Sequence, residues 1–258
     1  MALKVPPGST LAIMGPAASG KSHLLQAIVG SAGVARGTIS RPEKTLALSD
    51  PEWSRRDSPT SIARDILGKG SLQRSTDAIS ALGLWEVRQK SCLSLSPSQQ
   101  AAALFLPALL GDAQLICADH HWDHLDWLVL ESLWSVFQEL RREGAILAFA
   151  THRPDLAERS EHVLVLKSEQ VVFAGTPESL RRTIGETVIE VATDNRPGAR
   201  AIADPFDVDI EETEAGLRLE AKEGQALAAR ILLEGYGDVR YIIQRSPTFS
   251  EALTKLVS

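Results

Sequence analysis

The first segment that could do chemistry is Gly15-Pro16-Ala17-Ala18-Ser19-Gly20-Lys21-Ser22. Its spacing fits G-x-x-x-x-G-K-[ST], in which the glycines let the backbone turn its N–H groups toward a phosphate chain. Lys21 supplies a positive charge for the β- and γ-phosphates, and Ser22 offers a hydroxyl to Mg²⁺. A helix that begins here also points its positive end at the anion. The segment therefore predicts a phosphate-binding loop.

The residues on either side supply the elements that such a loop needs. Residues 10–14 form a short apolar run that predicts a strand. After the loop, one helical face carries Leu24, Leu25, Ile28 and Val29, and Gly30 can end that helix. A glycine-rich turn that matches by chance is the alternative, and the order of strand, loop and helix argues against it.

Two further predicted strands end in polar residues. Residues 114–118 lead into Asp119, and residues 145–150 lead into Thr151 and His152. The segment between them has apolar residues at helical spacing, namely Trp127, Leu130, Leu133, Phe137 and Leu140. Alternating strands and helices favour a parallel α/β sheet, whose ligands collect at the carboxyl ends of its strands. Asp119 is therefore placed to hold Mg²⁺, directly or through water.

The rest of the chain divides by composition. Residues 162–166 and 170–174 predict a hairpin, and Thr176 and Pro177 open a helix that runs to residue 182. We predict a P-loop NTPase fold, α/β with a mainly parallel sheet, over residues 1–183. A polar helical subdomain is inserted at about 51–106. Residues 184–258 predict a small C-terminal α+β domain, with strands near 187–192, 217–221 and 239–244.

Bulk composition narrows the class of protein. The formal net charge of -6 argues against a nucleic-acid-binding surface. The chain has no apolar run long enough to span a bilayer, and its start lacks a basic-then-apolar leader. Its cysteines, Cys92 and Cys117, give no disulfide framework, and Cys117 is expected to be a small buried hydrophobe. We expect a soluble, cytosolic protein.

Together with the P-loop, several segments resemble those of an ABC-transporter ATPase in order and spacing. Leu95-Ser96-Pro97-Ser98-Gln99 resembles the LSGGQ signature, and residues 115–119 resemble the Walker B strand. Ala150-Thr151-His152 resembles the switch-histidine loop, and residues 123–126 stand where the family has its D-loop, with Asp126 at its end. The likeness covers about residues 4–183. The C-terminal domain more loosely resembles extensions of some bacterial ABC ATPase subunits.

This resemblance implies ATP and Mg²⁺ as ligands at a site shared by two ATPase domains. His152 would then touch the γ-phosphate, and the signature residues would cap the ATP of the partner. The implied ATP-binding residues are Gly15, Pro16, Ala17, Ala18, Ser19, Gly20, Lys21, Ser22, His23 and Asp119, with Ser22, Asp119 and Asp50 on Mg²⁺.

The resemblance also implies partners. The expected ones are a second ATPase subunit, identical or different, and an integral membrane permease. The permease would contact the polar helical stretch that contains Trp53, Arg55 and Arg56. The expected location is the inner face of the cell membrane.

Several residues depart from the family pattern. His120 occupies the position of the catalytic glutamate and could act only as a weaker base, so we expect hydrolysis to be slowed or lost. Pro97 has no N–H to offer a phosphate, and Ser98 adds a side chain where the family has glycine. Asp50 occupies the position at which the family has its Q-loop glutamine. Pro107 should end or kink the helix after the signature, and no aromatic residue precedes Gly15.

The sequence leaves alternatives open. The chain could be a non-hydrolysing, nucleotide-gated interaction protein, or another P-loop enzyme such as a small-molecule kinase. Ser96, with Pro97 and Gln99 after it, also fits an ordinary capping box. His152 could be a surface histidine, and His120, His124 and His152 could together hold a transition metal.

Overall fold

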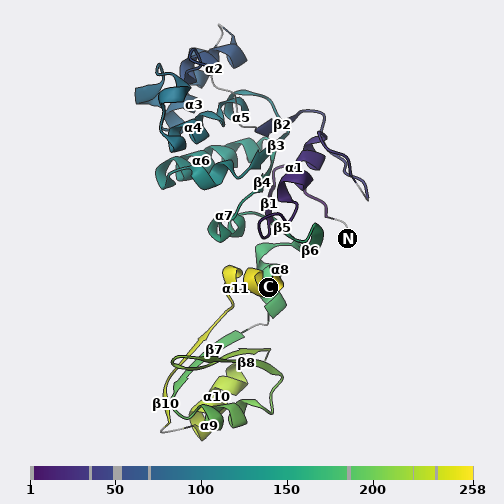
Figure 1. Ribbon diagram of the computed structural model, residues 1–258, viewed down its shortest axis with the longest axis vertical. Coiled ribbons are helices and arrows are strands. Elements are labelled where there is room, and N and C mark those ends of the chain that lie inside the picture. Colours follow the sequence, from purple (N-terminus) through teal and green to yellow (C-terminus); the bar gives the residue numbers. More distant parts are fainter. Residues whose placement is uncertain are drawn as a thin grey trace. The chain divides into compact units, whose positions relative to one another are not determined.

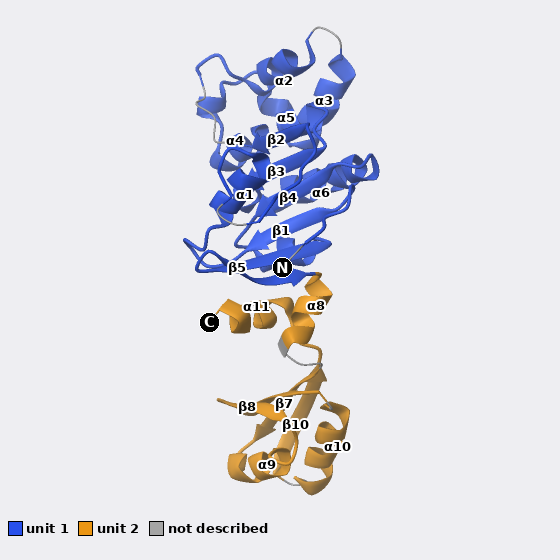
Figure 2. Ribbon diagram, turned by 90° about the vertical axis from the view of Figure 1, so that its right-hand side faces the viewer, with its two compact units in different colours: residues 1–175 blue, residues 176–258 orange. Residues whose placement is uncertain are grey.

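The computed structural model describes residues 3–34, 37–48, 54–68, 71–184, 187–222, 224–235 and 238–257. The chain divides into two compact units, Met1–Gly175 and Thr176–Ser258, which Figure 2 draws in blue and orange. The boundary predicted after residue 183 lies inside the second unit. No helix in the described part of the chain combines the length and the apolar character that crossing a bilayer requires.

Unit 1 is built on a six-stranded sheet with the order β2-β3-β4-β1-β5-β6. Every neighbouring pair from β2 to β5 is parallel, and β6 closes the sheet as an antiparallel hairpin with β5. This arrangement confirms the predicted mainly parallel α/β sheet. Its strands are β1 Thr10–Met14, β2 Thr45–Leu48, β3 Leu115–Asp119, β4 Ile146–Ala150, β5 His162–Lys167 and β6 Gln170–Gly175.

Helices cover both faces of this sheet, with α1 on one side and α6 on the other (Figure 1). In both views, α2, α3 and α5 lie at the β2 end of the sheet (Figures 1 and 2). The helices of unit 1 are α1 Lys21–Val29, α2 Pro59–Leu67, α3 Leu72–Ala81, α4 Pro97–Ala103, α5 Leu106–Leu110, α6 Trp127–Arg142 and α7 Pro154–Glu158. Short 3-10 turns lie at Trp85–Val87, Cys92–Ser94 and His121–His124.

The core of unit 1 has two halves, because successive side chains of a strand point to opposite faces of the sheet. On the α1 face, Leu25 and the neighbouring apolar residues of that helix pack on Leu11, Ile13, Cys117 and Ala148. Burial raises the pKa of the Cys117 thiol to about 12, as expected for a small buried hydrophobe.

On the opposite face, aromatic rings fill the space between the sheet and α6. The ring of Trp122 lies 5.0 Å from Phe105, 5.3 Å from Phe137 and 5.9 Å from Phe149, measured between centroids. Trp122 is fully buried and belongs to the 3-10 turn directly after β3. The aromatic cluster therefore anchors the turn that carries polar residues out of the end of β3. Trp127, the first of the apolar residues at helical spacing, is 70% exposed at the first position of α6.

The signature segment forms a helix start. Ser96 caps α4, its hydroxyl accepts from the Gln99 N–H, and the Gln99 side chain accepts from the Ser96 N–H. This confirms the predicted capping box. The predicted effect of Pro107 is also confirmed, because α4 ends at Ala103 and Pro107 lies in the first turn of a separate helix, α5.

Unit 2 contains a four-stranded antiparallel sheet with the order β10-β7-β9-β8. Apolar residues of α9 and α10 pack against one face of this sheet. The α+β prediction is confirmed, although the sequence analysis missed α9 and β8. The elements are α8 Pro177–Arg181, β7 Thr187–Thr193, α9 Arg196–Ala203, β8 Val208–Thr213, β9 Gly216–Ala221, α10 Gly224–Glu234, β10 Val239–Arg245 and α11 Phe249–Val257, with a 3-10 turn at Arg182–Ile184.

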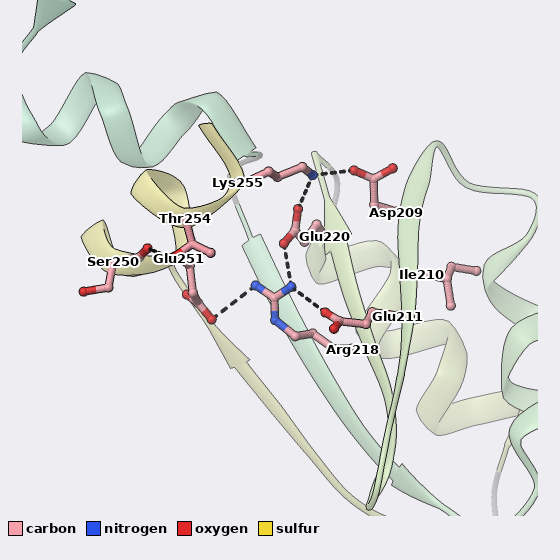
Figure 3. Close-up of a pocket in the computed structure, with 9 residues that line it drawn as sticks. All are labelled: Asp209, Ile210, Glu211, Arg218, Glu220, Ser250, Glu251, Thr254 and Lys255. Carbon is pink, nitrogen blue, oxygen red and sulfur yellow. Dashed lines mark hydrogen bonds and ion pairs between the residues drawn. The ribbon is translucent and has the colours of Figure 1, made fainter. Parts of the chain in front are cut away.

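Charged side chains attach α11 to the other face of that sheet (Figure 3). Lys255 pairs with Asp209 of β8 and Glu220 of β9, both at 2.6 Å. Arg218 of β9 pairs with Glu220 at 2.6 Å and with Glu251 of α11 at 3.2 Å. The cavity of about 570 Å³ beside these residues is therefore lined by side chains that already neutralise one another.

Glu251 provides a test of this ion-pair network. Two hydrogen bonds from Arg245, at 2.7 and 2.8 Å, hold the pKa of Glu251 far below its ordinary value of 4.5. A depressed folded-state pKa means that the stabilisation is present above pH 4.5 and is lost as the pH falls toward the folded value. We expect Glu251→Gln to lower the free energy of unfolding at pH 7 by about 1 kcal/mol, measured by denaturant titration.

Asp207→Asn is the matched control, because Asp207 pairs with Lys222 only loosely, at 3.5 Å, and both side chains are highly exposed. It should leave stability unchanged. The difference between Glu251→Gln and wild type should shrink below pH 4.5. A difference that persists unchanged at acidic pH would contradict the ion-pair account.

Candidate nucleotide-binding site

Three parallel strands bring the predicted site segments to one edge of the sheet. The register of β1, β3 and β4 places Ile13, Asp119 and Ala150 side by side. Beyond this row, the N–H of Thr151 donates to the Ile13 carbonyl at 3.2 Å, and the N–H of His120 donates to the Ala150 carbonyl at 3.1 Å. The phosphate-binding loop, Asp119 and the switch-histidine loop therefore start from one fixed row.

The loop after β1 has the backbone shape that its glycines allow. Gly15 has φ 145°, and a Cβ there would lie 2.2 Å from the carbonyl oxygen of Leu166 on β5. Gly20 has φ 95° immediately before α1, and Ala18 is left-handed as well, with φ 57°. Such reversals turn successive N–H groups inward, which is the geometry of an anion-binding nest.

Lys21 is folded back over this loop. Its Nζ donates to the carbonyl oxygens of Gly15 at 2.9 Å and Pro16 at 2.8 Å. Only 5% of the residue is exposed. Burial lowers its pKa from the ordinary value, and the negative charges of Asp119 and Asp123 oppose that shift. The ammonium group is thus held at the loop, where a phosphate would neutralise it.

Ser22 and Asp119 are the residues that could hold Mg²⁺. Both line a cavity of about 310 Å³ beside α1, together with Gln26 and His121. The Oδ1 atom of Asp119 is buried and has no hydrogen-bond partner among the described residues. A hydroxyl and a carboxylate are oxygen ligands of the kind that Mg²⁺ prefers, so these residues fit the ion. Asp50, the remaining predicted ligand, lies outside the described residues.

His120 and His152 meet above the ends of β3 and β4. Their rings are stacked, with centroids 4.4 Å apart and planes inclined by 12°. The His120 backbone is left-handed, with φ 59°, which is uncommon for a residue other than glycine. Burial, followed by the nearby charges of Lys21 and His120, lowers the pKa of His152. A neutral His152 ring can donate a hydrogen bond to a phosphate without a large desolvation cost.

The sequence analysis gave Asp123 no role of its own. This carboxylate accepts hydrogen bonds from the Thr151 hydroxyl and from the His152 N–H, the latter at 3.1 Å, and it lies 3.1 Å from Nδ1 of His120. It therefore links the turn after β3 to the loop after β4. The available signal was its spacing, three residues after His120 in the stretch that follows a strand.

The turn between β5 and β6 is a second feature that the sequence analysis missed. Ser168 and Glu169 both have positive φ, 49° and 62°, as in the tight turns that join antiparallel strands. The N–H of Glu169 donates to the Ser19 carbonyl at 3.1 Å. This hairpin thus contacts the predicted phosphate-binding loop. The residue types of the hairpin did not predict that contact.

The signature segment is attached to the D-loop of the same chain. The Ser98 hydroxyl donates to the Asp126 carboxylate at 3.1 Å and accepts from the Asp126 N–H at 3.0 Å. The same carboxylate caps α6 by accepting from the Val129 N–H. The side chain that replaces a glycine in this segment therefore fixes the position of α4 relative to α6. The predicted roles of Leu95, Ser96, Pro97, Ser98 and Gln99 toward a partner's ATP stay predictions.

The remaining predicted site residues are simple to place. His23 is exposed in the first turn of α1. Within the described ranges, no group of three or more His, Cys, Asp or Glu side chains is arranged to hold a metal ion. The transition-metal hypothesis for His120, His124 and His152 is therefore wrong. Two of these residues, His120 and His152, stack their rings on each other instead.

A strand, a glycine loop that holds a buried lysine, and a carboxylate at the end of β3, one strand further from β1 than β4, define a P-loop nucleotide-binding protein. Comparison narrows the class further. The ABC transporter family model matches residues 1–121. The lipoprotein-releasing system ATP-binding protein LolD 1 of Rhodospirillum rubrum is 30% identical over 198 residues, which cover 67% of this chain and 87% of the relative. The chain therefore belongs to the family of ABC transporter ATP-binding subunits.

Other relatives agree with this assignment. The zinc transport system ATP-binding protein TroB of Treponema pallidum is 27% identical and covers 71% of this chain and 79% of its own length. An ABC transporter ATP-binding protein of Bacillus subtilis, YhaQ, is 23% identical over 99% of this chain and 91% of its own length. Similarity to that relative thus extends through unit 2.

Solved structures show the same fold. An ATP-binding subunit of an ABC transporter has a TM-score of 0.59 at 20% identity and covers 70% of this chain and 84% of its own. A dimeric ATP-binding cassette in a post-hydrolysis state, bound to ADP and Pi, has a TM-score of 0.59 at 19% identity. The match covers 67% of this chain and 88% of that structure's chain.

Gly15 offers a test of the loop geometry. In Gly15→Ala, the added Cβ would collide with the Leu166 carbonyl. The alanine would also have to adopt a backbone with positive φ, which side chains rarely allow. Strain of about 1–3 kcal/mol should weaken ATP binding by about tenfold or more, measured by titration with a fluorescent ATP analogue. Gly33→Ala is the matched control, because a Cβ at Gly33 would meet none of the described residues within 4 Å. Equal affinities of the two variants would refute the proposed loop.

Proposed function

We propose that unit 1 binds Mg-ATP, with each site residue in the role that its place in the fold suggests. The loop N–H groups and Lys21 hold the phosphates, Ser22 and Asp119 hold Mg²⁺, and His152 contacts the γ-phosphate. The observation that carries this proposal is the buried Oδ1 of Asp119, which accepts no hydrogen bond from the described residues, in the cavity that Ser22 also lines. Bound Mg²⁺ would supply positive charge to the β- and γ-phosphates.

The same chain departs from its family where hydrolysis is catalysed. His120 follows Asp119 in place of the glutamate that polarises the attacking water, and a neutral imidazole has no fixed negative charge of its own. In the signature, Pro97 cannot donate an N–H, and the Ser98 hydroxyl is engaged with Asp126. These features support ATP binding with slowed turnover.

The function also requires partners. A second ATPase subunit, either a copy of this chain or a more complete one, would complete the site, and a similar fold is known as a dimer bound to ADP and Pi. An integral membrane permease would use the ATP-driven movement. Arg55 and Arg56 are exposed and available to it, whereas Trp53 lies outside the described residues. With such partners the chain would work at the inner face of the cell membrane.

A second candidate function follows from the same departures. If His120 and the altered signature abolish turnover, ATP would act as a ligand that changes partner affinity without being consumed. ATP-dependent dimerisation without turnover, in every partner context, would favour this nucleotide-gated role.

ATP hydrolysis by the purified chain tests the proposal. We expect slow turnover that Lys21→Ala abolishes, because that variant removes the charge held at the loop. We expect His120→Glu to raise turnover by about tenfold or more, since it restores a carboxylate next to Asp119. Turnover that Lys21→Ala leaves intact would refute this site as the source of the activity.

A further inference from the structure

The imidazole of His120 lies between two carboxylates that it contacts differently. Its Nδ1 is 3.1 Å from Oδ2 of Asp123, a hydrogen-bond distance. Its Nε2 is 3.5 Å from Oδ1 of Asp119, and that oxygen accepts no hydrogen bond within the described part of the chain. A neutral imidazole carries one N–H and one lone pair. The 3.1 Å contact therefore places an N–H at Nδ1, where Asp123 accepts it, and in the neutral ring this leaves the lone pair on Nε2.

The carboxylate of Asp123 is itself held in place. Its Oδ1 accepts from the Thr151 hydroxyl, and its Oδ2 accepts from the His152 N–H at 3.1 Å as well as facing His120. Thr151 is fully buried, and the Asp123 side chain is only 14% exposed. These hydrogen bonds on both oxygens hold the carboxylate against the ring of His120.

The ring of His120 is also fixed by its surroundings. The left-handed backbone of His120 and its stack on His152 leave it little rotational freedom. A strained residue of this kind persists only where its surroundings hold it, and such residues cluster at functional sites.

We propose that Asp123 is a positioning residue that keeps His120 in the Nδ1–H form, so that Nε2 accepts a hydrogen bond from the water that attacks ATP. The pair supplies, from two side chains, the negative charge and the acceptor that the family takes from one glutamate. The water oxygen bonds to the γ-phosphorus, the bond to the β,γ-bridging oxygen breaks with its electron pair on ADP, and the displaced water proton passes to solvent. This inference rests on the proposed ATP site.

The test reads the tautomer directly, without nucleotide. Nitrogen-15 NMR of the full chain at one fixed pH distinguishes the protonated from the unprotonated ring nitrogen of His120. We expect Nδ1–H in wild type. In Asp123→Ala the ring loses its acceptor, and we expect Nε2–H, the form that free imidazole side chains prefer in water. In Asp123→Asn the amide oxygen can take the place of Oδ2, so that Nδ1–H is kept.

Turnover and affinity then separate this inference from the ATP site itself. We expect Asp123→Ala to lower turnover at saturating ATP by about tenfold to a hundredfold, a larger change than any in ATP affinity, and Asp123→Asn to recover part of the loss. Asp155→Asn is the matched control, because Asp155 pairs with Arg153 and not with His120. It should change neither the His120 signals nor turnover.

Three results would overturn the inference. They are Nε2–H in wild-type His120, Nδ1–H that survives in Asp123→Ala, or equal turnover of the wild-type and Asp123→Ala chains. If the wild-type chain does not bind ATP, the proposed ATP site is refuted instead. The tautomer result would still decide whether Asp123 orients the ring.

Discussion

The site depends on one constraint, the parallel register of β1, β4 and β3. Hydrogen bonding between these strands puts Ile13, Ala150 and Asp119 in one row, so that three loops leave the sheet at the same level. Two of those loops are then joined to their neighbours by backbone bonds from Thr151 and His120. Residues more than a hundred positions apart thus share one small volume, and a slip of the register would separate them.

Apolar side chains are buried behind this row on both faces of the sheet. The fully buried Trp122 anchors the turn after β3 among the aromatic rings of the α6 face, directly between His121 and Asp123. On the other face, α1 packs on the same strands and begins at Lys21. Polar groups at the sheet edge are therefore oriented by apolar packing on both sides, which lets Asp123 and the two stacked histidines hold a single arrangement.

Local residue patterns predicted much of this arrangement. The left-handed glycine turn before α1, the strand before Asp119 and the cap at Ser96 each follow from neighbouring residues, and the structure contains them. The role of Asp123 depends on contacts 28 and 29 residues away along the chain, at Thr151 and His152, which only the folded sheet brings close. In unit 2, α9 was missed because its first turn contains Pro197 and Gly198, which usually break helices.

The central claim is that Ser22 and Asp119 complete the P-loop as a Mg-ATP site. The most direct test is the ATP affinity of wild type and Asp119→Asn, each measured by calorimetry with and without Mg²⁺. We predict that Mg²⁺ strengthens ATP binding to wild type by about tenfold, within the usual range of coupling between two ligands, and that Asp119→Asn cancels this gain. An equal gain in both proteins, or no gain in wild type, would contradict the account.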